Sequence, residues 1–271
     1  NEAMMGGGVY GTGSNVTSMS CSWMTNMATM GGGVYATDMS MVTDTSSTWT
    51  SNSATEWGGA VAMLTSSPLV LSSSSFDHNM AVTGAGVYAV LGSSVTATNA
   101  TWTMNVASSS GGGIYSNSTV DLMTCMLTSN NATDGGGLMG MWAMVTSTGS
   151  MWSMNYASNS GGGASLDGSS LHITTDTFTS NEAMMGGGVY GTGSNVTSMS
   201  CSWMTNMATM GGGVYATDMS MVTDTSSTWT SNSATEWGGA VAMLTSSPLV
   251  LSSSSFDHNM AVTGAGVYAV L

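Results

Sequence analysis

The chain repeats one short pattern of apolar and polar positions along its whole length. An asparagine recurs every 25–27 residues, and a large apolar side chain precedes each later asparagine by three residues. Gly, Ser and Thr fill most of the intervals. The asparagines are Asn1, Asn26, Asn52, Asn79, Asn105, Asn130, Asn155, Asn181, Asn206, Asn232 and Asn259. The large apolar residues are Trp23, Trp49, Phe76, Trp102, Leu127, Trp152, Phe178, Trp203, Trp229 and Phe256.

Two further apolar positions keep a constant place in every repeat. One lies ten residues before the asparagine, and the other follows a glycine-rich element such as Gly31-Gly32-Gly33. The first series is Val16, Val42, Leu69, Val95, Val120, Val145 and Leu171. The second series is Val9, Val34, Val61, Val87, Ile114, Leu138 and Ala164. Short Val, Thr, Trp and Tyr runs between Gly, Ser and Asn predict strands and turns, because helices need an apolar spacing near 3.6 residues.

A side chain that occurs once per repeat can be buried only against its counterpart in the next repeat. The sequence therefore predicts an all-β parallel β-helix, or solenoid, with about 25–27 residues per coil. We expect three short strands in each coil, coils about 4.8 Å apart, and Trp23 directly beside Trp49. We also expect the asparagines to form a ladder of amide hydrogen bonds at a buried turn. The glycine triplets are expected at a corner that needs positive φ or close backbone contact.

The short repeats are grouped into a longer one. Residues 181–271 repeat residues 1–91 letter for letter, so that seven coils make a unit of 180 residues. Residues 1–180 are one tandem unit, and residues 181–271 are the start of the next identical unit. We expect one continuous solenoid without a linker, rising about 34 Å per unit. Such an undrifted duplication is typical of a long tandem array.

The composition limits the partners of the chain. It has no Lys or Arg and a formal net charge of −14, which argues against nucleic acids and anionic membrane surfaces. No apolar run reaches the roughly 20 residues of a membrane-spanning helix.

The methionine content leaves a second interpretation open. The chain has 28 Met, and Met24, Met27, Met104 and Met154 stand where other repeats carry Thr, Ser, Asp or Glu. Methionine has about the shape of Gln and of the Lys and Arg stems. The letters therefore also fit a sequence read from density, in which Met stands for Gln, Lys or Arg, and the charge argument then weakens.

Catalytic chemistry is not expected. Glycoside hydrolysis needs two carboxylates about 5–10 Å apart, whereas we expect Glu56 and Asp134, which share a column, to lie three coils apart. His78 and His172 are single imidazoles with no second ligand at metal-binding spacing, and we expect His78 on a surface turn. We predict no enzymatic activity, no metal site and no cofactor.

The cysteines are predicted to be structural. Cys21 and Cys125 both lie two residues before the large apolar residue and should share a column four coils apart. A disulfide needs Cα atoms within about 7 Å, so the two are not expected to pair. We expect each to be a small core residue.

Several polar and aromatic positions are predicted to face outward. Asn15, Asn99, Asn117 and Asn195 begin Asn-x-Thr sequons outside the asparagine series and are possible glycosylation sites. The sequon at Asn131 adjoins the series and is the weakest. A row of tyrosines should mark a lateral contact or a sugar-stacking surface: Tyr10, Tyr35, Tyr88 and Tyr115.

The pairing of an aromatic-x-x-Asn motif with a Gly-Gly-Ala-Val motif resembles a known repeat family. Phe178-Thr179-Ser180-Asn181 and Gly58-Gly59-Ala60-Val61 are similar to the repeats of the polymorphic outer-membrane protein family. The likeness spans the chain, with Trp in place of Phe in four of seven coils. The resemblance implies a right-handed parallel β-helix that is shown on a cell surface and is often adhesive.

These observations favour a structural repeat protein that forms the rigid shaft of an extracellular filament, fibre or surface appendage. Its expected partners are copies of itself, joined end to end or laterally, and glycans are a second candidate. A surface adhesin or carbohydrate-binding β-helix is the alternative, and a polysaccharide-active enzyme is a third possibility.

Overall fold

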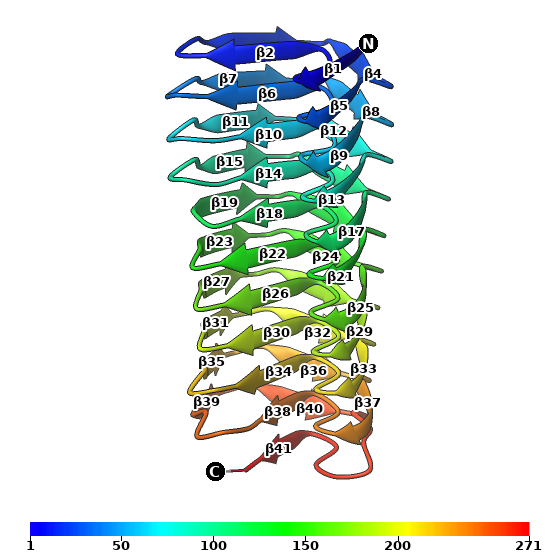
Figure 1. Ribbon diagram of the computed structural model, residues 1–271. Coiled ribbons are helices and arrows are strands. Elements are labelled where there is room, and N and C mark those ends of the chain that lie inside the picture. Colours follow the sequence, from blue (N-terminus) through cyan, green and yellow to red (C-terminus); the bar gives the residue numbers. More distant parts are fainter. Residues whose placement is uncertain (271) are drawn as a thin grey trace.

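The computed structural model describes residues 1–270 as a right-handed parallel β-helix (Figure 1). The chain winds about a single axis, and four parallel sheets form the walls of the rod. We name the sheets A, B, C and D in the order in which each coil passes through them. No helix occurs in the described part of the chain.

From β1 to β40 the strands of the four sheets follow one another in strict rotation along the chain, and the last strand, β41, returns to sheet B. Sheet A contains β1 (Glu2–Met5), β5 (Met27–Met30), β9 (Ser53–Trp57), β13 (Met80–Thr83), β17 (Val106–Ser110), β21 (Asn131–Asp134), β25 (Tyr156–Ser160), β29 (Glu182–Met185), β33 (Met207–Met210) and β37 (Ser233–Trp237). Sheet B contains β2 (Val9–Thr12), β6 (Val34–Thr37), β10 (Val61–Met63), β14 (Val87–Ala89), β18 (Ile114–Ser116), β22 (Leu138–Met141), β26 (Ala164–Asp167), β30 (Val189–Thr192), β34 (Val214–Thr217), β38 (Val241–Met243) and β41 (Val267–Ala269).

The other two sheets complete each coil. Sheet C contains β3 (Val16–Met19), β7 (Val42–Thr45), β11 (Leu69–Ser72), β15 (Val95–Thr98), β19 (Thr119–Met123), β23 (Met144–Thr148), β27 (Ser170–Thr174), β31 (Asn195–Met199), β35 (Met221–Thr225) and β39 (Leu249–Ser252). Sheet D contains β4 (Ser22–Met24), β8 (Thr48–Thr50), β12 (Ser75–Asp77), β16 (Thr101–Thr103), β20 (Met126–Thr128), β24 (Met151–Ser153), β28 (Thr177–Thr179), β32 (Ser202–Met204), β36 (Thr228–Thr230) and β40 (Ser255–Asp257).

The expectation of three strands per coil is wrong, because the wall before each asparagine is bent. Sheets C and D meet at a residue in the left-handed region, such as Ser46 (φ 54°) or Thr124 (φ 51°). This bend carries Ser, Thr or Asn in most coils and so gives no glycine signal in the sequence. One predicted strand therefore becomes two.

The predicted apolar columns are confirmed. The rings of Trp23 and Trp49 stack with centroids 4.7 Å apart and planes 3° from parallel. The column continues through Phe76 and Trp102 to Leu127, each in register with the residue of the coil before. The two valine-rich series likewise pair in register along sheets B and C, for example Val34 with Val61.

The asparagine ladder is also confirmed and is fully hydrogen-bonded in the middle of the rod. The Nδ2 of Asn52 donates to Asn79 Oδ1 at 3.0 Å and to the Trp23 carbonyl at 2.8 Å. Its Oδ1 accepts from the backbone N–H and the Nδ2 of Asn26. Asn52 is completely buried, so water cannot hydrogen-bond to its amide. The ladder bonds supply the partners that the buried amide needs.

Residues 1–91 and their identical copy, residues 181–271, show how the core is made. Trp23, in the first coil, is partly exposed, whereas its counterpart Trp203 is fully buried between neighbours. Cys21 is exposed and its counterpart Cys201 is buried in the same way. A single coil therefore cannot bury its own apolar face, and the adjacent coils supply the cover.

Glycines close the corner between sheets A and B. The first glycine of each triplet takes positive φ, for example 67° at Gly111. A Cβ on the second, Gly112, would lie 2.4 Å from the Gly136 carbonyl oxygen and 2.7 Å from that of Asn131. Both obstacles are backbone, so the prediction of close backbone contact at this corner is confirmed.

Candidate functional site

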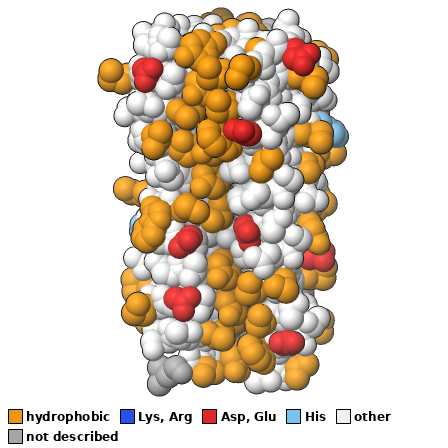
Figure 2. All heavy atoms as spheres, viewed as in Figure 1, with side chains coloured by type: hydrophobic (Ala, Val, Ile, Leu, Met, Phe, Trp, Pro, Cys, Tyr) orange, Lys and Arg blue, Asp and Glu red, His pale blue; other side chains and the backbone are white. Residues whose placement is uncertain are grey.

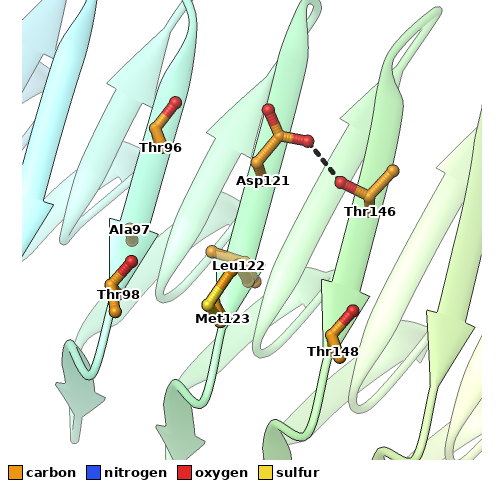
Figure 3. Close-up of a pocket in the computed structure, with 8 residues that line it drawn as sticks. All are labelled: Thr96, Ala97, Thr98, Asp121, Leu122, Met123, Thr146 and Thr148. Carbon is orange, nitrogen blue, oxygen red and sulfur yellow. Dashed lines mark hydrogen bonds between the residues drawn. The ribbon is translucent and has the colours of Figure 1, made fainter.

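The outer face of sheet C carries a shallow depression lined by hydroxyl groups and one carboxylate. Thr96, Asp121 and Thr146 lie side by side on β15, β19 and β23, and Thr146 donates a hydrogen bond to Asp121 (Figure 3). Thr98, Met123 and Thr148 form the next row along the strands. The strand alternation places these residues outside and points Ala97 and Leu122 into the core.

The depression is small and open, and most of its polar groups can form hydrogen bonds. Its volume is about 270 Å³ and it is open to solvent, whereas pockets that enclose a ligand usually hold about 300–1,000 Å³. His172 follows Thr146 in the same row, but no second carboxylate adjoins Asp121 in register. The depression can accept and donate hydrogen bonds to a sugar, and it lacks the second acid that glycoside hydrolysis needs.

The prediction that Glu56 and Asp134 share a column three coils apart is wrong. The registers of sheet A shift at irregularities, and Asp134 aligns through Ser110 and Thr83 with Trp57. Ser160 and Asn159 donate to the Asp134 carboxylate at 2.6 and 2.8 Å. Asp134 is thus held in a local hydrogen-bond network, away from Glu56.

Three carboxylates lie inside the rod, which the sequence analysis missed. Asp44 and Asp224 are completely buried, and each accepts a hydrogen bond through Oδ2 from an indole, at 3.1 Å from Trp49 and 2.9 Å from Trp229. The Oδ1 of each has no hydrogen-bond partner among the described residues. The signal was available, because Asp44 is two residues after Val42 and therefore points to the same, inward side.

Asp176 is the third buried acid, in the small-residue column that also holds Cys201. Its Oδ1 accepts from the Ser150 N–H at 2.9 Å and its Oδ2 from the Trp152 indole at 3.0 Å. Burial raises the pKa of Asp176, and these hydrogen bonds oppose the rise. The folded chain therefore holds this proton to a higher pH than the unfolded chain does.

This raised pKa gives a predicted pH dependence. The stability contributed by protonated Asp176 is present at low pH and is lost as the pH rises through its folded pKa. We expect the thermal midpoint to fall less steeply in Asp176→Asn than in the natural chain between about pH 4 and neutrality. Asp121→Asn, on the surface, is the control and should keep the natural slope. Equal slopes in Asp176→Asn and the natural chain would contradict the assignment.

His78 and Cys125 lie where the sequence predicts them. The prediction that Cys21 is a small core residue is wrong, because Cys21 lies in the first coil and is exposed. His78 is exposed at a turn, where its Nδ1 lies 2.9 Å from the Asp77 carboxylate. Cys125 and Cys201 are free and buried, and burial raises the pKa of both thiols. Residues 1–270 contain no group of three or more His, Cys, Asp or Glu side chains that could hold a metal ion.

The sequon asparagines lie at corners and strand starts. Asn15, Asn99 and Asn195 are exposed, and Asn117 is half-buried between sheets B and C. Asn131 is exposed at the start of β21. All are therefore outside the ladder, and their glycosylation stays a prediction.

The tyrosine row faces outward as expected but is more covered than expected. Tyr35 is 8% exposed, and Tyr88 stacks between Trp57 and Tyr115 with centroids 5.4 and 5.2 Å apart. Burial, with a smaller contribution from neighbouring Tyr115, raises the pKa of Tyr88 to about 12. Figure 2 shows the apolar band along this face. The stacked rings cover each other's faces, so that the row offers ring edges, which favours lateral packing over sugar stacking.

Methionine dominates the exposed apolar surface. Of 28 Met, 21 are exposed, and Met39, Met104, Met154 and Met219 also have positive φ. A thioether gains nothing from a wet position, and Met is usually a core residue. These positions suit polar side chains.

We expect tandem mass spectrometry of the native chain to find Gln, Lys or Arg at many of the exposed Met positions. Met63 and Met243, which are buried, are the internal controls and should remain Met. Trypsin gives a faster test, because it cuts only after Lys or Arg. A chain that resists trypsin after unfolding and shows Met throughout would disprove this interpretation.

Comparison with known proteins gives no relative. No protein-family model, no curated protein and no solved structure matches the chain. The likeness to polymorphic outer-membrane protein repeats therefore stays a prediction from the motifs. Residues 1–270 include no helix that is both long and apolar enough to cross a membrane.

Proposed function

We propose that the chain is the rigid shaft of an extracellular filament, fibre or surface appendage, without enzymatic activity. The observation that carries the proposal is the unbroken stacking of four parallel sheets, of ten or eleven strands each, along one axis. Every coil is tied to the next by backbone bonds on all four walls and by the asparagine ladder inside. Bending such a rod would stretch several of these bonds together.

The corners between sheets support the same proposal. The corners between sheets B and C are short. The chain advances four residues from the last inward position of sheet B to the first of sheet C in the shortest corner, Ser116 to Val120, and six in the longest, such as Ala89 to Val95. Enzymes usually carry their active-site residues on longer loops. The corners here leave the outline of the rod nearly constant along its axis (Figure 1).

Chains with one, two and three copies of the 180-residue unit test the shaft. We expect electron microscopy to show straight rods that lengthen by about 34 Å with each added unit. Immunogold labelling of unpermeabilised source cells should mark surface fibres. Rods that collapse or kink as units are added, or labelling confined to the cell interior, would contradict the proposal.

A carbohydrate-binding surface is the second candidate, and the hydroxyl-lined depression at Asp121 favours it. Neutral oligosaccharides should bind the natural chain and bind Asp121→Ala about tenfold less tightly, since one charge-assisted hydrogen bond is lost. Asp77→Ala, on the outer face of sheet D, is the matched control. Unchanged binding in Asp121→Ala would exclude this depression as the sugar site.

A further inference from the structure

One tryptophan does not belong to any column or row of the rod. Trp142 lies at the corner between sheets B and C and is 73% exposed, whereas Trp102 and Trp152 are completely buried. Its backbone has φ 55°, which is unfavourable for a bulky side chain. The same corner carries Gly168 and Gly193 in the following coils, with φ 57° and 55°. An indole thus occupies a position that suits glycine, with its surface in solvent.

The backbone of Gly168, in the following coil, packs against this indole. A Cβ on Gly168 would lie 2.4 Å from Cε3 and 2.5 Å from Cζ3 of Trp142. The six-membered ring therefore lies directly over the Gly168 backbone, where any other residue would collide with it. One face of the indole is fixed against the rod.

The coil on the other side of Trp142 does not cover the second face. Ser116 aligns with Gly140, and Val120 aligns with Val145. The chain advances four residues from Ser116 to Val120 in the preceding coil, but five residues from Gly140 to Val145 in the coil of Trp142. The corner of the preceding coil is therefore one residue shorter than the corner that carries Trp142. This accounts for the exposure of Trp142.

The shorter corner carries a sequon, Asn117-Ser118-Thr119. Asn117 Oδ1 accepts from the Leu91 N–H of the preceding coil at 3.0 Å and from Ser118 Oγ at 3.2 Å. The bond from Leu91 holds this oxygen toward the preceding coil. The Asn117 Nδ2, on the other side of the amide, has no acceptor within hydrogen-bond distance among the described residues. An oriented amide with a free nitrogen thus lies one coil, about 4.8 Å, from the corner of Trp142.

We propose that Trp142 is the stacking platform for a neutral pyranose and that Asn117 is the position at which the chain carries that sugar. The C–H groups of a pyranose face pack on the electron-rich face of an aromatic ring. Asp167, in the adjoining coil, accepts a backbone bond from the Trp142 N–H at 2.8 Å, and its negative charge disfavours an anionic sugar. The covalent attachment of the sugar to Asn117 rests on the proposed extracellular function of the chain.

The sugar would be attached by transfer of a glycosyl group to the Asn117 Nδ2. Nδ2 attacks the anomeric carbon of a glycosyl pyrophosphate donor held by a separate glycosyltransferase. The C–N bond forms, the C–O bond to phosphate breaks, one Nδ2 proton passes to a base of that enzyme, and the pyrophosphate leaves with the electron pair. A free neutral glycan would supply the same pyranose without this step.

Hydroxyl-radical footprinting of the native protein, read residue by residue by mass spectrometry, tests the platform. We expect a glycan on the Asn117 peptide and expect Trp142 to oxidise roughly threefold or more faster after peptide N-glycanase removes the glycan. Trp57, on sheet A, should not change. Glycosylated Asn117 with unchanged Trp142 oxidation would overturn the proposal.

Two variants made in a glycosylating host separate the sources of the sugar. Thr119→Ala removes the sequon of Asn117 and should expose Trp142 to oxidation, whereas Thr101→Ala removes the sequon of Asn99 and should not. If Asn117 is bare, protection of Trp142 by neutral oligosaccharides assigns a free glycan as the source. A bare Asn117 with no protection by any neutral oligosaccharide overturns the inference and leaves the shaft proposal standing.

Discussion

Gly112→Ala is expected to destabilise the rod strongly, because the corner between sheets A and B has no room for a methyl group. The new Cβ would meet the carbonyl oxygens of Gly136 and Asn131 at 2.4 and 2.7 Å and the Asn131 nitrogen at 2.8 Å. Backbone atoms cannot move aside without breaking the ladder bonds on both neighbouring coils. We expect a loss of about 4 kcal/mol or more, seen as a lower thermal midpoint.

Gly191→Ala is the matched control for this substitution. The nearest atoms to a Cβ on Gly191 are at 3.6 and 3.8 Å, which is ordinary contact. The next coil already has an alanine there, since Gly191 pairs in register with Ala216. Its midpoint should stay within the small range of a surface change. A Gly112→Ala chain as stable as Gly191→Ala would show that the A–B corner can relax.

Asn130→Ala is expected to cost about 3–5 kcal/mol, because it breaks the ladder at a fully buried point. The Asn130 Nδ2 donates to the Trp102 carbonyl at 2.9 Å and to Asn155 Oδ1 at 3.0 Å. Its Oδ1 accepts from the N–H and Nδ2 of Asn105. Alanine leaves all of these partners without a bond and out of reach of bulk water.

The next residue in the chain provides the control. Asn131 is exposed at the start of β21, and Asn131→Ala should change stability by less than about 0.5 kcal/mol. Hydrogen exchange would locate the damage in Asn130→Ala at sheet A and the adjoining end of sheet D. Equal effects of the two substitutions would show that the ladder adds nothing to stability.

The sequence predicts the columns well because a solenoid turns sequence period into spatial contact. Trp23 and Trp49 are 26 residues apart, Asn26 and Asn52 likewise, and in each pair the side chains touch in the structure. The same logic fails for the shape of a coil. The bend between sheets C and D uses Ser and Thr in the left-handed region, which local composition does not reveal.

The surface was harder to predict than the core. The register of sheet A slips at irregularities, so Asp134 moved from the expected column of Glu56 to that of Trp57. Trp142 gave no periodic signal, since it occurs once in each 180-residue unit. Its setting depends on Gly168 and on a corner one residue shorter in the preceding coil, and both appear only when neighbouring coils are aligned.

The asparagine ladder points in one direction throughout the rod. Each Nδ2 donates toward the coil that follows, from Asn1 to Asn26 at one end and from Asn232 to Asn259 at the other. Wherever such a stack is cut, one new surface presents a bare amide oxygen and the other presents bare amide hydrogens. Two cut surfaces of the same kind repel each other, while unlike surfaces fit. A fibre assembled on this principle has a head and a tail, and subunits can join it in a single orientation.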